Sequence, residues 1–146
     1  MSETLYKPGV CNIGKNEIRK RYFGAIIGFI LVVIVGIFLV EFNIYMPVSL
    51  SLLFFPFLLG FEGLFQARWK FCAGFASNRK YDFSGTIDQV GKVEDDLDHH
   101  KDMQTAMKLH AYSVFLSLLF TAIVIGVYYG PYLLIPTPTV SLRILF

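Results

Sequence analysis

The residues best suited to chemistry lie in an acidic, histidine-rich stretch at positions 94–103 and at His110 just beyond it. If this region is helical, with about 100° between successive residues, Asp95, His99 and Asp102 share one face. His110 extends that face toward the C-terminus. An aspartate and a histidine one turn apart can chelate zinc, iron or copper. The same pattern is also typical of a solvated or partner-docking helix face whose acidic residues favour the helix start.

Glu62 is the one acidic residue inside a long apolar segment. A carboxylate in such a segment is costly unless it is paired or can extend its charged end to the membrane surface, which makes Glu62 a functional candidate. Its expected neighbours at that depth are His110, Tyr112 and Ser113. We hypothesise a hydrogen bond from Glu62 to His110 or to Tyr112 that fixes the second apolar segment to the third. A proton or ion relay at Glu62 is the alternative.

Three long apolar segments would position these residues. A helical run of about 20 uncharged residues matches a hydrocarbon core of roughly 30 Å, and apolar runs suited to this role occupy residues 22–40, 44–65 and 109–129. Of the 146 residues, 55% are hydrophobic and only 16% are charged, which is too apolar for a soluble domain. The expected fold class is an all-α membrane protein, a single membrane domain (1–146) with three transmembrane helices.

Basic residues predict the orientation of these helices. A cluster of arginine and lysine at residues 19–21 precedes the first span, and further basic residues occur within residues 66–108. The positive-inside rule then predicts a cytoplasmic arm (1–21), a cytoplasmic loop and helix (66–108) and an external tail (130–146). We expect an uncleaved, multi-pass protein of the cell membrane. The net charge of +2 lies at the membrane edges, so no nucleic-acid partner is implied.

Local signals predict where the helices begin, bend and end. Asn16 is a candidate N-cap for a helix that continues into the first span, and Pro56 should kink the second span or free a carbonyl. Residues 71–76 are apolar enough for a short helix in the interface. A last helix should begin near Val93, continue into the third span and end at residues 130–131, which are Gly-Pro.

Small residues predict how the spans pack. Gly24 and Gly28 are one turn apart on the first span, where another backbone could approach closely. Ala122, Gly126 and Gly130 form a similar face on the third span, which could receive the first. The partner of the first face would be in this chain or in another chain. Glycine is also simply common in membrane helices, which is the alternative explanation.

Cys11 and Cys72 are the only cysteines, and both would lie at the cytoplasmic membrane edge. They could be small buried hydrophobic residues, lipidation sites, or ligands of a metal or redox site together with His99 or His100. Zinc sites usually have three or four ligands at recognisable spacings, and the chain has neither His-Glu-x-x-His nor Cys-x-x-Cys. We expect no cofactor. The alternative is a transition metal bound by Cys11, Cys72, Asp95, His99 and His100.

Two strings of residues resemble a known family. They are Pro8-Gly9-Val10-Cys11-Asn12-Ile13-Gly14 with Glu17 and Arg19, and Gly63-Leu64-Phe65-Gln66-Ala67-Arg68 leading to Phe71-Cys72. Over about the first half of the chain, the sequence is similar to a family of small multi-spanning membrane proteins of archaea and some bacteria that has no assigned activity. The resemblance implies a multi-spanning topology. It draws attention to Cys11, Gln66, Arg68 and Cys72 without giving any of them a role.

These observations favour a non-catalytic protein that packs in the lipid bilayer against other membrane-protein subunits. Three helices enclose little space, and the small-residue faces suit helix packing. We expect an accessory or structural subunit of a larger membrane complex of respiratory or oxygenase type. One alternative is a metal- or redox-binding membrane protein that uses the cysteines and histidines named above. The other is a self-associating channel or transporter around Glu62.

Overall fold

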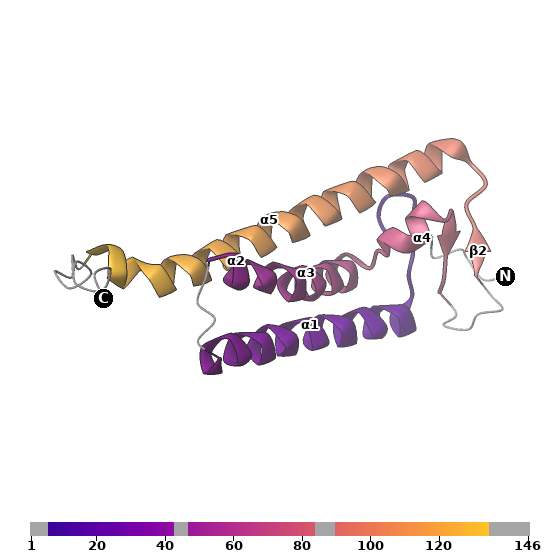
Figure 1. Cartoon of the computed structure of the whole chain (residues 1–146). Coiled ribbons are helices and arrows are strands. Elements are labelled where there is room, and N and C mark those ends of the chain that lie inside the picture. The colour runs from indigo at the N-terminus through magenta and orange to yellow at the C-terminus, as the bar shows by residue number, and fades with distance from the viewer. Residues whose placement is uncertain (1–5, 43–46, 84–89, 135–146) are drawn as a thin grey trace, which may run out of the picture.

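The computed structural model describes residues 6–42, 47–83 and 90–134 of the chain. Within these ranges, three helices are long and apolar enough to cross a membrane, and they cover Lys15–Glu41, Val48–Trp69 and Asp96–Tyr129. Figure 1 shows α3 (Phe54–Trp69) lying between α1 (Lys15–Glu41) and α5 (Asp96–Leu134). The expected helical architecture with three long apolar helices is therefore present.

Helix α1 begins at Lys15, directly after Gly14. Asn16, which the sequence suggested as the N-cap, lies inside the first turn, so that prediction is wrong. Gly14 occupies the cap position because its N–H donates to the carbonyl oxygen of Asp82 at 2.7 Å, which holds Gly14 in an extended conformation. From Lys15 the helix continues without a break through residues 22–40, as expected.

The second apolar helix is irregular in its first half. It consists of α2 (Pro47–Leu50), a 3-10 turn (Ser51–Leu53) and α3. Pro56 has no N–H to donate to the carbonyl one turn earlier, and the chain tightens into the 3-10 turn just before it. The sequence predicted a kink or a freed carbonyl at Pro56, and the structure has a 3-10 turn just before this proline. The predicted first residues of the span, 44–46, lie outside the described residues.

Helix α5 begins at Asp96, later than the expected start near Val93. Val93 is held outside the helix because its N–H donates to the carbonyl oxygen of Arg79 at 2.8 Å. Asp95 then caps the helix, with its Oδ1 accepting the N–H of Leu97 at 2.8 Å.

The end of α5 also differs from the prediction. The helix does not stop at residues 130–131 but continues to Leu134. A proline this close to the end of a helix removes only one backbone hydrogen bond, so the last turn can still form. The remainder of the expected external tail, residues 135–146, lies outside the described residues.

A small polar domain closes one end of the helices. We call it the polar cap and define it as residues 6–14, 70–83 and 90–105. It contains α4 (Ala73–Ser77), close to the short helix expected at residues 71–76, and the antiparallel strands β1 (Lys80–Tyr81) and β2 (Gly91–Lys92). No strand was expected from the sequence.

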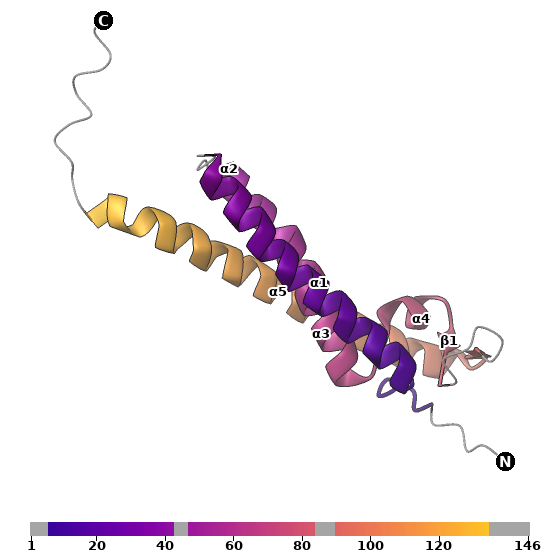
Figure 2. The same ribbon diagram turned by 90° about the horizontal axis from the view of Figure 1, so that it is seen from below.

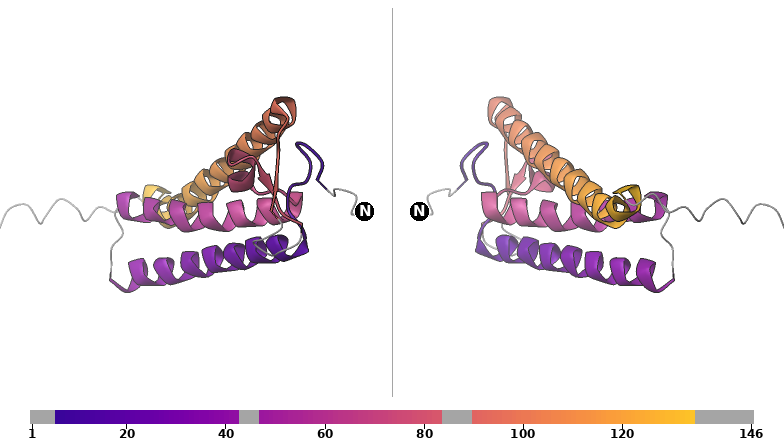
Figure 3. Two further views of the ribbon diagram at one scale, coloured as in Figure 1. Left: turned by 90° about the vertical axis from the view of Figure 1, so that its right-hand side faces the viewer. Right: turned by 90° about the vertical axis from the view of Figure 1, so that its left-hand side faces the viewer.

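The polar cap fills the space left by the inclination of α5. Figure 3 shows that the first turns of α5 stand away from α1 and α3, on the side where α4 and the strands lie. Figure 2 shows that the opposite end of α5 also inclines away from α1. Tyr128 and Tyr129 near this end still pack against the core cluster that includes Leu50 and Leu53. The three helices therefore form an open arrangement rather than a closed bundle.

Glycines allow α1 and α3 to approach closely. A Cβ atom added to Gly28 would lie 2.4 Å from the backbone nitrogen of Gly60, and one added to Gly63 would lie 2.8 Å from the backbone nitrogen of Ala25. Any larger residue at Gly28 or Gly63 would clash with the backbone of the other helix. The small residues that meet are thus Gly28 with Gly60 and Ala25 with Gly63.

The small-residue faces of the first and third spans, which we considered as packing partners, do not contact each other within the described residues. Cβ atoms added to Gly24 or Gly126 would meet nothing within 4 Å, and Ala122 is exposed. The reason is that α3 lies between α1 and α5 and supplies its own glycines to α1 (Figure 1). The surroundings of Gly130 lie outside the described residues.

Helices α3 and α5 pack through small hydroxyl residues and aromatic rings. Ser113 and Ser117 on α5 are fully buried, and their hydroxyls donate to the carbonyls of Leu109 (3.0 Å) and Ser113 (2.7 Å). Phe120 lies 5.8 Å from Phe57 and 5.2 Å from Phe61 between ring centroids. Back-bonded serines are short enough to let neighbouring helices pack closely.

Candidate functional site

The most suggestive polar contact lies within the apolar helices and joins α3 to α5. Glu62 Oε2 lies 3.0 Å from His110 Nδ1, and Glu62 Oε1 accepts a hydrogen bond from Gln66 Nε2 at 3.3 Å. Of the two pairings hypothesised from the sequence, the structure contains the one with His110. Tyr112 instead packs edge-on against Trp69, with 5.8 Å between ring centroids. The carboxylate is thus held from both helices.

This pair is not enclosed by the chain. The side chain of His110 is 58% exposed and that of Glu62 is 24% exposed. Leu59 and Phe55 precede Glu62 by one and two turns on α3, and they are 47% and 66% exposed. Glu62 and His110 therefore form a polar spot on the outer surface of two apolar helices.

Asp102, from the predicted polar stripe, holds the N-terminal arm instead of a metal. It is fully buried, and its carboxylate accepts hydrogen bonds from the hydroxyl of Tyr6 (2.9 Å) and the N–H of Gly9 (2.6 Å). The hydroxyl of Thr105 donates to the carbonyl of Gly9 at 2.7 Å. Burial, together with the hydrogen bond to Asp102 and its charge, raises the pKa of Tyr6 above its ordinary value.

Glycine is required where the arm crosses α5. Gly9 has a φ of +71°, and a Cβ atom there would lie 3.2 Å from the Cβ of Lys101. Both the left-handed backbone and the close approach favour glycine. The Pro8-Gly9 turn signal in the sequence marks this crossing.

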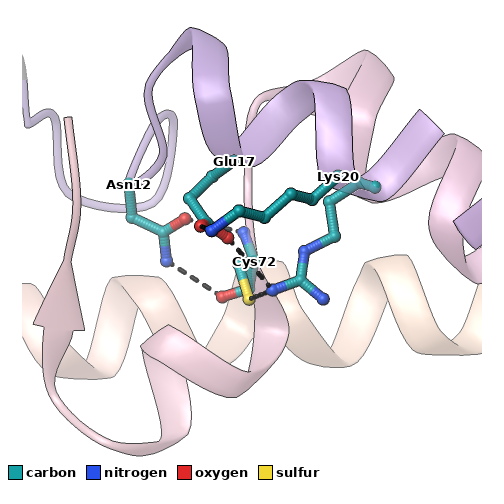
Figure 4. Close-up of polar contacts among 5 residues, drawn as sticks. Asn12, Glu17, Lys20 and Cys72 are labelled. Carbon is teal, nitrogen blue, oxygen red and sulfur yellow. Dashed lines mark hydrogen bonds and ion pairs between the residues drawn. The ribbon is translucent and has the colours of Figure 1, made fainter. Parts of the chain in front are cut away.

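Asn12 and Cys72 join the arm to the segment after α3. The side chain of Asn12 donates to the carbonyl of Cys72 at 3.0 Å and accepts the N–H of Cys72 at 2.7 Å, and both residues are buried (Figure 4). The thiol of Cys72 lies 3.2 Å from Nη2 of Arg21, which also lies 3.6 Å from Glu17. These contacts connect the polar cap to the first turns of α1.

The proposed metal ligands are not brought together. Asp95 caps α5, His100 Nε2 lies 3.1 Å from the side-chain nitrogen of Gln104, and the Cys11 thiol makes a long contact of 3.7 Å with the Ile13 carbonyl. Both cysteines are free thiols. Among residues 6–42, 47–83 and 90–134, no three His, Cys, Asp or Glu side chains are grouped as a metal site would need. The metal alternative thus gains no support from the arrangement.

The predicted stripe on α5 is divided among separate tasks. Asp95 caps the helix, Asp102 holds the arm and His110 pairs with Glu62. His99 Nδ1 is buried and has no hydrogen-bond partner among the described residues. Sequence reasoning missed Tyr6 and Asn12 as structural residues.

Comparisons with protein-family models, with curated proteins and with solved structures find no match for this chain. The family resemblance noted from the sequence therefore stays an expectation.

Proposed function

We propose that this chain is a non-catalytic integral membrane protein that serves as a structural subunit of a larger membrane assembly. The three apolar helices would cross the cell membrane, with the polar cap on the cytoplasmic side. The basic residues around positions 15–21 and 66–70 favour this orientation by the positive-inside rule. The respiratory or oxygenase type of the assembly is part of this proposal and is tested by identifying the partner.

The observation that carries the proposal is the outward-facing pair of Glu62 and His110. Ionisable groups at membrane depth are costly and almost always face a protein interior or a water-filled cavity. Here the pair is partly exposed, beside the exposed apolar side chains of Leu59 and Phe55. A helix from another subunit would cover this face and remove the polar pair from lipid.

The other polar contacts support a structural rather than a catalytic role. Asp102 fixes the arm to α5, and Asn12 fixes the arm to Cys72, each through two short hydrogen bonds. These groups are buried, and their hydrogen-bonding atoms are engaged with the chain itself. They join the N-terminal arm to α5 and to the segment after α3.

Site-specific photocrosslinking in the source membrane tests the proposal. A photoreactive amino acid at Leu59 should give a discrete adduct with a second polypeptide, because Leu59 is exposed beside Glu62. Ile30 on α1 is similarly exposed, at 52%, and provides the matched control position. The proposal would be contradicted if the photoreactive amino acid formed no protein adduct at Leu59 and none at Phe55. An adduct with a second copy of this chain would favour the self-associating alternative.

A further inference from the structure

A cavity opens where the N-terminal arm, the start of α1 and the end of α3 meet. Its volume is about 600 Å³, and its lining includes the buried Ile13 together with Ile18 and Phe83. Lys15 at the start of α1 and Lys70 just after α3 also line the cavity, and both are exposed. The cavity thus combines an apolar lining with two cationic side chains.

Neither lysine is neutralised by a carboxylate among the described residues. By contrast, Lys101 pairs with Asp98 at 2.8 Å, and Lys20 pairs with Glu17. A second hollow of about 380 Å³ adjoins the first, shares Asn16 with it and is lined by Arg19, Lys20 and Phe23. The open surface around the start of α1 therefore presents positive charge beside apolar side chains.

The backbone at Lys70 is unusual for a lysine. Lys70 follows the last turn of α3 with a φ of 55°, in the left-handed region. Glycine or asparagine would adopt this conformation at lower cost. A lysine at this position provides a long cationic side chain to the cavity that neither of those residues could supply.

We propose that the cavity binds the phosphate group of an anionic membrane phospholipid. Lys15 and Lys70 contact the phosphate, and an acyl chain lies against Ile18 in the cavity and Phe23 in the adjoining hollow. The proposal rests on the membrane insertion proposed above, because that places the start of α1 at the level of the headgroups. It does not depend on a partner subunit. A soluble phosphate compound shares the headgroup's chemistry, so the experiment separates the two sources.

Native mass spectrometry of the purified protein in detergent measures the binding. The probes are phosphatidylglycerol, phosphatidylcholine as the zwitterionic comparison, and inorganic phosphate alone. The test variant combines Lys15→Gln with Lys70→Asn, since asparagine tolerates the left-handed backbone. The control variant combines Lys80→Gln with Lys92→Gln, which removes two charges from exposed residues paired across β1 and β2.

The wild type and the control should retain one phosphatidylglycerol in preference to phosphatidylcholine. The test variant should bind it roughly thirtyfold more weakly, because each lysine near an anionic surface contributes about a factor of five. Lys15→Gln alone should lose about fivefold, which guards against a folding defect in the double variant. Displacement of the lipid by inorganic phosphate would assign the phosphate site to a soluble ligand. Equal retention by the test variant and the wild type would overturn the proposal.

Discussion

Glu62 on α3 and His110 on α5 lie 3.0 Å apart on the outer surface of the apolar helices. The pair connects two helices that otherwise pack through serines and aromatic rings, and it leaves 58% of the His110 side chain exposed. A partly exposed contact between a carboxylate and an imidazole contributes little to the stability of the isolated chain. Its larger effect is expected where another helix covers it and excludes water.

Replacing Glu62 by glutamine separates these two effects. Glu62→Gln should lower the stability of the isolated protein by less than about 1 kcal/mol. It should nevertheless reduce the yield of co-purifying partner severely, because an amide is a weaker hydrogen-bond acceptor for His110 than a carboxylate where another helix excludes water. Thermal unfolding in detergent and quantitative co-purification measure the two quantities.

The matched control is Asp96→Asn, which removes an exposed ion pair with Arg79 in the polar cap. It should leave both stability and co-purification unchanged, because the Asp96 side chain is 85% exposed. If Glu62→Gln left the partner yield at the wild-type level, the role given to the pair would be wrong.

The contact between Gly28 and Gly60 predicts a contrast between glycines of the same helix. Gly28→Ala should lower the thermal midpoint, with a cost of at least about 1–3 kcal/mol, because the new Cβ would lie 2.4 Å from backbone and the helices must separate. Gly24→Ala and Gly36→Ala have open space at the Cβ position and should be neutral or slightly stabilising. Equal effects at all three positions would contradict the packing described.

Asp102 predicts the behaviour of the N-terminal arm. Asp102→Ala removes the acceptor for both Tyr6 and Gly9, so docking of the arm should weaken by about 2–4 kcal/mol. Limited proteolysis should then cut the arm near Lys7 much faster than in the wild type. Tyr6→Phe, which removes one of the two bonds, should have a smaller effect of about 1 kcal/mol. A cleavage rate unchanged in Asp102→Ala would show that the arm is held by other contacts.

The raised pKa of Tyr6 predicts a pH dependence at the alkaline end only. A group whose pKa is higher in the folded state stabilises that state fully below its unfolded value of 10.0, and the contribution is lost as the pH rises further. Arm docking should therefore be insensitive to this group near neutral pH and weaken above about pH 10. The difference in phenolate absorbance between wild type and Tyr6→Phe measures the ionisation directly. Ionisation of Tyr6 with the ordinary tyrosine pKa of 10.0 would contradict the contact with Asp102.

The apolar helices could be predicted from the sequence because their signal is local. Uncharged runs of sufficient length indicate the three long helices, and Pro56 indicates the irregular turn before α3. The pairing of Glu62 with His110 could also be anticipated, since an isolated carboxylate in an apolar segment needs a partner from a neighbouring helix.

The polar cap could not be predicted because its contacts join residues far apart in the chain. Asn12 bonds to Cys72, and Tyr6 bonds to Asp102, and no local periodicity encodes either contact. The same limit affected the helix packing: the glycine spacing at Gly24 and Gly28 indicates a close approach but not which side of α1 faces α3. The polar stripe on α5 suggested a single site. Helical spacing shows that its residues share a face of α5, but it does not show which other segment of the chain packs against each turn of that face.

The assignment as a structural subunit is best tested by the native mass of the particle extracted from the source membrane in a gentle detergent. We expect a particle much larger than the 16.6 kDa chain, containing this chain and at least one other polypeptide at a fixed ratio. The assignment as a structural subunit would be contradicted if the extracted particle contained only this chain in every detergent that keeps other membrane complexes intact.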